Sequence, residues 1–166
     1  MMKNSFEKSK NILTAAKRQF CTFTLSDHIF GVDILDVREI NSTSDFTPIF
    51  HAPKEIRGYV NIRGQIHLIL DLRMLLGYKP AETGQDSRLV LFKPGVGENF
   101  GVLVDKIGDV VSVDEDRIEE RNKEEMQESE ADVQRMANLT VGVCKLDSDL
   151  MVILEPKKFL KALKAD

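Results

Sequence analysis

The feature that most constrains the fold is an internal repeat of short, strand-like segments. Phe-Gly-Val at 30–32 recurs at 100–102, an offset of 70, and Leu-Ile-Leu-Asp at 68–71 recurs as Val-Ile-Leu-Glu at 152–155, an offset of 84. The first match extends through four further pairs: Ile34/Val104, Val37/Ile107, Glu39/Asp109 and Ile40/Val110. The pattern predicts about five short strands in each half, and closure removes the exposed edges of so small a sheet. We therefore expect a mainly β fold of two small five-stranded barrels with a groove between them.

The organisation of the chain follows from its polar stretches. Residues 1–18 are polar and basic and predict a flexible tail or a short helix, and 19–166 predict a single domain. Within that domain the polar linker at 79–86 separates a first lobe of about 19–80 from a second lobe of about 86–155. Residues 156–163 predict a closing helix with one apolar face.

A hairpin is predicted in the middle of the chain. Residues 59–62 and 65–70 favour extended backbone, and Gly64 can supply the positive φ of a tight turn. Asp71 then suits the N-cap of a short helix. Arg63 beside this turn is either a solvated arginine or a binding residue, and spacing alone leaves both open.

The charge of the chain is uneven. Residues 114–132 hold ten acids against three basic residues, a net charge of −7, while the remainder carries +3. We expect a solvated, partly helical excursion here, with a partner-binding helix as the alternative. A remainder so weakly basic, with no Trp and two Tyr, disfavours binding to nucleic acid.

The cellular compartment of the protein is indicated by the absence of targeting signals in the sequence. No run approaches the roughly 20 apolar residues that span a bilayer, and no signal-peptide core is present. We therefore expect a cytoplasmic protein. Cys21 and Cys144 are expected to be two buried, reduced thiols, although one disulfide is an alternative.

Catalytic and cofactor motifs are weak. Ser26-Asp27-His28 holds the residue types of a hydrolase triad, but three consecutive turn residues cannot converge as nucleophile, base and orienter. The glycines at 95, 97 and 101 lack the spacing of a dinucleotide loop, and a strand follows them instead of a helix. The three histidines are too far apart for metal-ligand spacing. We expect no enzyme activity, no cofactor and no metal.

Four motifs carry a resemblance to a known family. These are Phe-Gly-Val-Asp-Ile-Leu-Asp-Val-Arg-Glu-Ile at 30–40, Gly-Tyr-Val-Asn-Ile-Arg-Gly at 58–64, Asp-Leu-Arg at 71–73 and Phe-Gly-Val-Leu-Val-Asp at 100–105. In order and spacing they resemble the CheW family of chemotaxis coupling proteins, over about 20–163. The resemblance implies two five-stranded SH3-like barrels around a shared core.

The resemblance also implies function and partners. A family member is a non-enzymatic adaptor that couples the cytoplasmic tips of methyl-accepting chemoreceptors to the regulatory domain of the histidine kinase CheA. It would lie at the receptor array under the inner membrane, be peripheral to the membrane only through receptors, and be monomeric when isolated.

Site residues carry over by motif. Arg63 and Glu39 match residues that matter for assembly, and we expect a charge-assisted pair between them. Four positions match the lining of the family's receptor groove, where an amphipathic helix would bury apolar residues: Val37, Gly58, Leu89 and Val90. Asn61, Gly64 and Gly101 complete the expected receptor- and kinase-binding set through their motifs.

Alternatives remain within and outside this family. The acidic excursion replaces a Pro-rich connection of many members, so an adaptor of a non-flagellar system for pilus or gliding motility is one alternative. A CheV-like coupling domain, or part of a CheA-like kinase, is another; because the last motif ends near 163, we expect a stand-alone adaptor. A small-barrel enzyme or nucleic-acid binder is disfavoured by the charge balance and the missing site.

Overall fold

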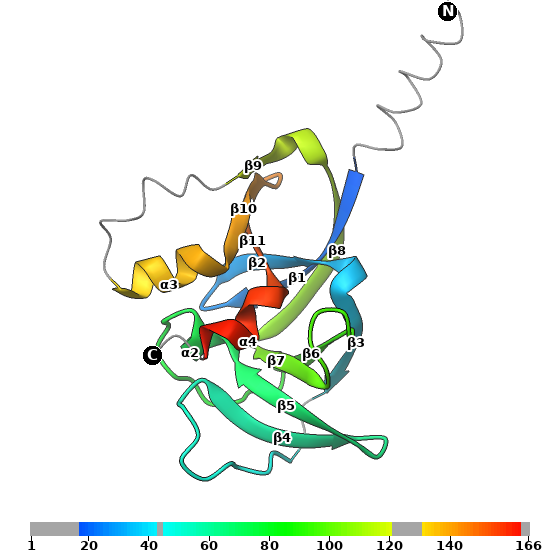
Figure 1. Ribbon diagram of the computed structural model, residues 1–166. Helices are drawn as coiled ribbons and strands as arrows, with labels where there is room; N and C mark the ends of the chain where they lie inside the picture. Colours follow the sequence, from blue (N-terminus) through cyan, green and yellow to red (C-terminus); the bar gives the residue numbers. More distant parts are fainter. Residues whose placement is uncertain (1–16, 43–44, 121–130, 164–166) are drawn as a thin grey trace, which may run out of the picture.

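Two β-sheets form the body of the molecule in the computed structural model, which describes residues 17–42, 45–120 and 131–163 (Figure 1). The first, sheet A, has the order β8-β1-β2-β11-β10-β9. Its strands are β1 (Lys17–Leu25), β2 (His28–Asp33), β8 (Lys106–Asp114), β9 (Ile118–Glu120), β10 (Thr140–Lys145) and β11 (Leu150–Leu154). The second, sheet B, has the order β3-β6-β7-β5-β4. Its strands are β3 (Val37–Ser42), β4 (Ile56–Ile62), β5 (Gln65–Asp71), β6 (Arg88–Phe92) and β7 (Phe100–Val104).

Short helical segments connect these strands. They are η1 (Ile34–Asp36), α2 (Leu72–Leu75), η2 (Glu115–Arg117), α3 (Ala131–Leu139), η3 (Pro156–Lys158) and α4 (Phe159–Ala162). The expected mainly β fold with short helices, including a closing one after Pro156, is confirmed. Sheet A has six strands and not five because the three-residue strand β9 pairs with β10, an element that the acidic sequence did not predict.

The internal repeat is real, but its halves are exchanged between the sheets. The Phe-Gly-Val strand β2 pairs in parallel with β11, with Phe30 opposite Val152 and Gly31 opposite Ile153. The repeat-equivalent strand β7 pairs in parallel with β5, with residues 100 and 101 opposite 68 and 69. The two registers are equivalent, so the molecule has internal pseudo-symmetry. Each sheet therefore joins the Phe-Gly-Val strand of one half to the last strand of the other half.

This exchange corrects the expected lobe boundary. Sheet A contains β1 and β2 from the N-terminal half together with β8 to β11, and sheet B contains β3 to β7. A division at 79–86 would cut sheet B between β5 and β6, so lobes of about 19–80 and 86–155 do not correspond to the sheets. The repeat offset reveals which strands are equivalent, but it does not reveal whether they pair within a half or across halves.

Three apolar clusters hold the sheets together. The largest, which we call the shared core, lies between them and takes Phe23 and Phe30 from sheet A with Phe92 and Phe100 from sheet B, closed by Phe159 of α4. Two smaller clusters, one in sheet A and one in sheet B, lie on the face of each sheet that points away from the shared core. Burial of aromatic and aliphatic side chains from both sheets in one cluster makes them a single folding unit.

The structure describes two parts of the acidic region, residues 114–120 and 131–132. The chain continues from β8 through η2 into β9, and α3 ends at Leu139. Residues 121–130 of the predicted excursion lie outside the described part of the chain. Arg135 of α3 donates a hydrogen bond of 3.0 Å to the buried carboxylate of Glu55, which ties α3 to the loop before β4. β1 begins at Lys17, so residues 17 and 18 of the predicted N-terminal tail belong to a strand; residues 1–16 lie outside the described part.

The two cysteines are free thiols in the structure. Cys21 and Cys144 are 3% and 1% exposed, so the expectation of two buried, reduced thiols is confirmed. Burial raises the pKa of both thiols, which keeps them protonated and unreactive.

Asp71 caps α2 as expected and does so from a buried position. Its Oδ1 accepts a hydrogen bond of 3.3 Å from the Met74 amide, and its side chain is almost completely removed from solvent. Burial raises the pKa of the Asp71 carboxyl above its ordinary value of 3.8, a shift that the Met74 amide and the nearby Arg57 cation only partly offset.

Replacement of Asp71 with Asn should flatten the pH dependence of stability. Because the folded-state pKa is raised, the native chain holds a proton that the unfolded chain has already lost, so stability falls as pH rises above 3.8. Asn keeps the cap and cannot ionise. Urea unfolding over a pH series should therefore show an Asp71→Asn protein at least as stable as the wild type near pH 7. A variant with an unchanged pH slope would contradict this account.

Candidate protein-binding site

The turn between β4 and β5 is built by its own sequence. Arg63 and Gly64 both have positive φ, 50° and 84°, as the two central residues of a type I′ hairpin turn require. The Asn61 Oδ1 accepts a hydrogen bond of 2.9 Å from the Gly64 amide, which fixes the turn from within. Asn61 and Gly64 thus define the turn, and Arg63 is presented at its tip.

Arg63 reaches across to the far edge of the same sheet. Its guanidinium donates to the Glu39 carboxylate of β3 in an ion pair. Because β3 and β4 are the outer strands of sheet B, this contact joins its two ends. Arg38 makes a second, longer contact of 3.5 Å with Gln65. The predicted pairing of Arg63 with Glu39 is confirmed.

Exposure decides what this pair can contribute. The Arg63 side chain is 65% exposed and that of Glu39 is 23% exposed. Ion pairs so open to solvent stabilise a fold by only about 0–1 kcal/mol. The main effect of the pair is therefore to position a charged group on the surface, and its contribution to stability is small.

Two exposed apolar residues on the edge strands β3 and β8 were missed as site residues. Ile40 lies opposite Val90 on β6, and Val110 lies opposite Cys21 on β1; both partners belong to the shared core. Opposed residues share a sheet face, so Ile40 and Val110 lie on the faces that the sheets turn toward each other. They are nevertheless 41% and 52% exposed because β3 and β8 are edge strands. The repeat equates Ile40 with Val110, but their exposure depends on strand order, which the repeat does not reveal.

These residues extend a partly buried apolar surface. Val37 and Ile107, another repeat-equivalent pair on β3 and β8, pack against the shared core and are partly buried. Both edge strands lie on the side of the molecule opposite α3 (Figure 1). We call Val37, Ile40, Ile107 and Val110 the edge strip. It continues the shared core to the surface.

Four expected site residues are not at the surface. Leu89 and Val90 are both 0% exposed, Leu89 inside sheet B and Val90 in the shared core, so the expectation that they line an open groove is wrong. On the regular alternation of β6, each faces one of the two apolar clusters on either side of the sheet.

The two glycines of the expected set are also structural. A Cβ on Gly58, where φ is 144°, would lie 2.5 Å from the Thr47 carbonyl oxygen, and one on Gly101 would lie 2.6 Å from the Val90 carbonyl oxygen. Both positions require glycine because another backbone approaches too closely. The structure thus brings Glu39, Asn61, Arg63 and Gly64 together at the surface, with Val37 nearby on β3.

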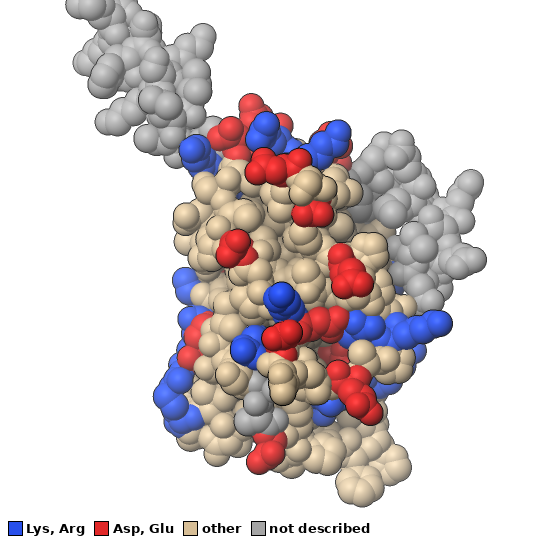
Figure 2. Space-filling view, turned by 180° about the vertical axis from the view of Figure 1, so that it is seen from behind, with Lys and Arg blue, Asp and Glu red and all other residues tan. Residues whose placement is uncertain are grey.

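The charged surface is mixed in sign. Figure 2 shows basic and acidic side chains interspersed over one face, with neutral surface between them. Within residues 17–42, 45–120 and 131–163, no three His, Cys, Asp or Glu side chains are grouped as a metal site would need. None of the helices in these ranges is long and apolar enough to cross a membrane. Apolar contact and a positioned ion pair are what this site offers, which defines a β-barrel module that binds other proteins.

Comparison with known proteins places this module in a family. The model of the CheW-like domain matches residues 19–164, and the chain belongs to the CheW family of chemotaxis coupling adaptors. It is 29% identical to a probable chemotaxis protein CheW of Rhizobium etli, over 86% of this chain and 87% of that protein. It is 25% identical to the chemotaxis protein CheW of Helicobacter pylori, over 96% of each. The crystal structure of the scaffolding protein TtCheW from Thermoanaerobacter tengcongensis superposes with a TM-score of 0.71 at 26% identity, covering 82% of this chain and 88% of that one.

Proposed function

We propose that the chain couples chemoreceptors to the histidine kinase CheA without catalysing a reaction itself. In this role it binds the cytoplasmic tip of a receptor and the regulatory domain of the kinase at the same time. It then lies in the cytoplasm at the receptor array, needs no cofactor, and reaches the membrane only through receptors.

The observation that carries the proposal is the pairing of an exposed apolar strip with a positioned arginine. A receptor tip is an antiparallel helical hairpin, and an amphipathic helix buries its apolar face in a shallow apolar surface. The edge strip supplies such a surface. Arg63, fixed by Glu39 and by the rigid turn, supplies a separate directional contact on sheet B, suited to a carboxylate or carbonyl of a partner.

Co-sedimentation tests this function directly. Receptor-bearing membranes are mixed with CheA and the chain, and both pelleted protein and kinase autophosphorylation are measured. We expect the chain to pellet with the receptors and to raise kinase activity. Failure of both would refute the coupling role, and pelleting without stimulation would limit the chain to receptor binding.

The edge strip gives the first mutational test. Val110→Glu should weaken receptor binding at least tenfold, because a carboxylate would be buried against the apolar face of the helix. Val110 is 52% exposed, so the free energy of unfolding should change by no more than about 0.5 kcal/mol. Phe50→Glu is the control, since Phe50 is a large apolar residue that is 91% exposed outside the strip. Equal receptor binding by Val110→Glu and wild type would exclude the strip.

A further inference from the structure

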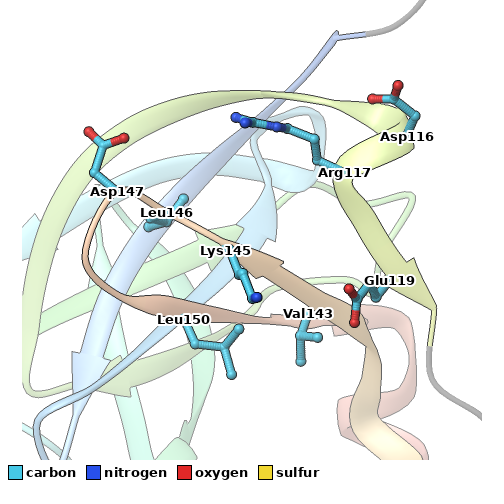
Figure 3. A pocket seen from close by; sticks show the side chains of 8 residues that line it. All are labelled: Asp116, Arg117, Glu119, Val143, Lys145, Leu146, Asp147 and Leu150. Carbon is cyan, nitrogen blue, oxygen red and sulfur yellow. The ribbon is translucent and has the colours of Figure 1, made fainter.

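A pocket lies at the other end of the molecule from the hairpin turn. It has a volume of about 420 Å³, within the roughly 300–1,000 Å³ of sites that hold small ligands. Figure 3 shows its two walls, one from η2 and β9 and the other from β10, β11 and their connecting turn. The edge strip and the Arg63–Glu39 pair contribute no residue to it.

The lining combines an apolar floor with acidic groups. Val143, Leu146 and Leu150 supply apolar surface, and Leu150 is 51% exposed although it is a large aliphatic side chain. Three carboxylates, those of Asp116, Glu119 and Asp147, line the same pocket. A pocket of this kind suits an apolar side chain with cationic neighbours.

The charges of this pocket are not balanced internally. Arg117 and Lys145 also line it, which leaves three acids against two bases. Within the part of the chain that the structure describes, none of the three carboxylates is in an ion pair. The flanking residues Asp114, Glu115 and Glu120 add three more acids, so the local net charge is −4.

The chain before β1 enters the molecule beside this pocket. Lys17, the first residue of β1, lies opposite Asp114 of β8. Asp116 on the pocket wall follows two residues later. Phe6 precedes Lys17 by eleven residues, which can extend to about 36 Å. That length gives Phe6 a wide range of positions around the start of β1, on the side where the pocket wall begins.

The composition of residues 1–16 complements the pocket. Phe6 is the only aromatic residue of the segment, and Lys3, Lys8 and Lys10 lie within four positions of it. With Glu7 as the only acid, the segment carries a net charge of +2 against the −4 of the pocket region. An apolar anchor flanked by cations matches an apolar floor flanked by carboxylates.

We propose that residues 1–16 bind in the pocket between β9 and the β10–β11 hairpin, with Phe6 on the floor formed by Val143, Leu146 and Leu150. Lys3, Lys8 and Lys10 then neutralise the carboxylates of Asp116, Glu119 and Asp147. A tethered segment has an effective concentration near the millimolar range, so even weak contacts keep the site occupied. When residues 1–16 occupy the pocket, they cover Leu150 and exclude other proteins from this end of the molecule.

A spin label tests this contact in the full-length chain. Cys21 and Cys144 are buried, so a nitroxide reagent should modify a cysteine introduced by Ser5→Cys. We expect strong broadening of the methyl resonances of Val143, Leu146 and Leu150, and none at Ile40 or Ile66 near the hairpin end. Adding Phe6→Ser should remove most of the broadening and shift the same methyl resonances, whereas Asn11→Ser should do neither.

Two outcomes would overturn the proposal. A segment that is merely tethered near the pocket would give the same broadening with and without Phe6→Ser. If an added partner protein shifted the pocket methyls equally in wild type and Phe6→Ser, the pocket would serve that partner and not the chain's own segment. Lys3→Glu, Lys8→Glu and Lys10→Glu combined should mimic Phe6→Ser, which separates charge from packing. An unchanged spectrum in the triple variant would remove the electrostatic half of the proposal.

Discussion

Replacing Arg63 with alanine should weaken assembly with kinase and receptor about 10- to 100-fold, the range of a binding hot spot. The substitution removes an exposed cation that the type I′ turn and the Glu39 carboxylate hold in one orientation. It also leaves Glu39 without its partner, which adds a repulsive charge to the binding surface. The fold should survive, since so exposed a pair contributes little to stability.

Binding and stability must be measured on the same Arg63→Ala preparation. Pull-down with CheA and with receptor membranes gives the loss of affinity, and urea unfolding gives the change in stability, expected within about 1 kcal/mol. Arg117→Ala, which removes an exposed arginine from η2, is the control and should bind both partners normally. Normal binding by Arg63→Ala, or a chain that does not fold, would refute the interface role.

Replacing Leu89 with alanine should destabilise the chain by about 2–5 kcal/mol, the cost of emptying a core position. Leu89 is 0% exposed and packs with Val60, Ile69, Leu91 and Leu103 inside sheet B. The family resemblance placed this residue in a receptor groove. The Leu89 side chain has no accessible surface. Any loss of receptor binding in Leu89→Ala would therefore result from lost packing and not from a lost contact with the receptor.

Comparison with Ile40→Ala separates a role in core packing from a role in receptor binding. Ile40 is 41% exposed on the edge strip, so its truncation should cost well under 1 kcal/mol of stability yet reduce receptor binding. Urea unfolding followed by circular dichroism, with receptor co-sedimentation, gives both quantities. A Leu89→Ala chain of normal stability that no longer bound receptors would restore the groove assignment.

Local structure and family were predictable because they depend on short stretches of sequence. Asn61, Arg63 and Gly64 specify a hairpin turn through φ preferences and one side-chain hydrogen bond, all within four residues. The cap at Asp71 and the closing helix after Pro156 follow in the same way. The contact between Arg63 and Glu39 was also anticipated, although its part in assembly stays a prediction.

Surface and core could not be distinguished along the edge and central strands. Leu89, Val90, Ile40 and Val110 are all apolar residues in β-rich segments, and nothing in composition separates them. Leu89 and Val90 lie on β6, which has neighbours on both sides, while Ile40 and Val110 lie on strands with one free edge. Exposure therefore depends on strand order, which is set by pairing between distant segments.

The sequence by itself determined most of the strands, the hairpin turn, the cap at Asp71 and the repeat that relates the two halves. Each is encoded by contacts between residues near one another in the chain, or by similarity that can be counted. Only the tertiary structure decided that the halves exchange strands, through the parallel pairs β2–β11 and β5–β7. Parallel pairing needs a long crossover, and equivalent strands offer equivalent edges to either half. The choice between them is made by which apolar faces can be buried together in the shared core.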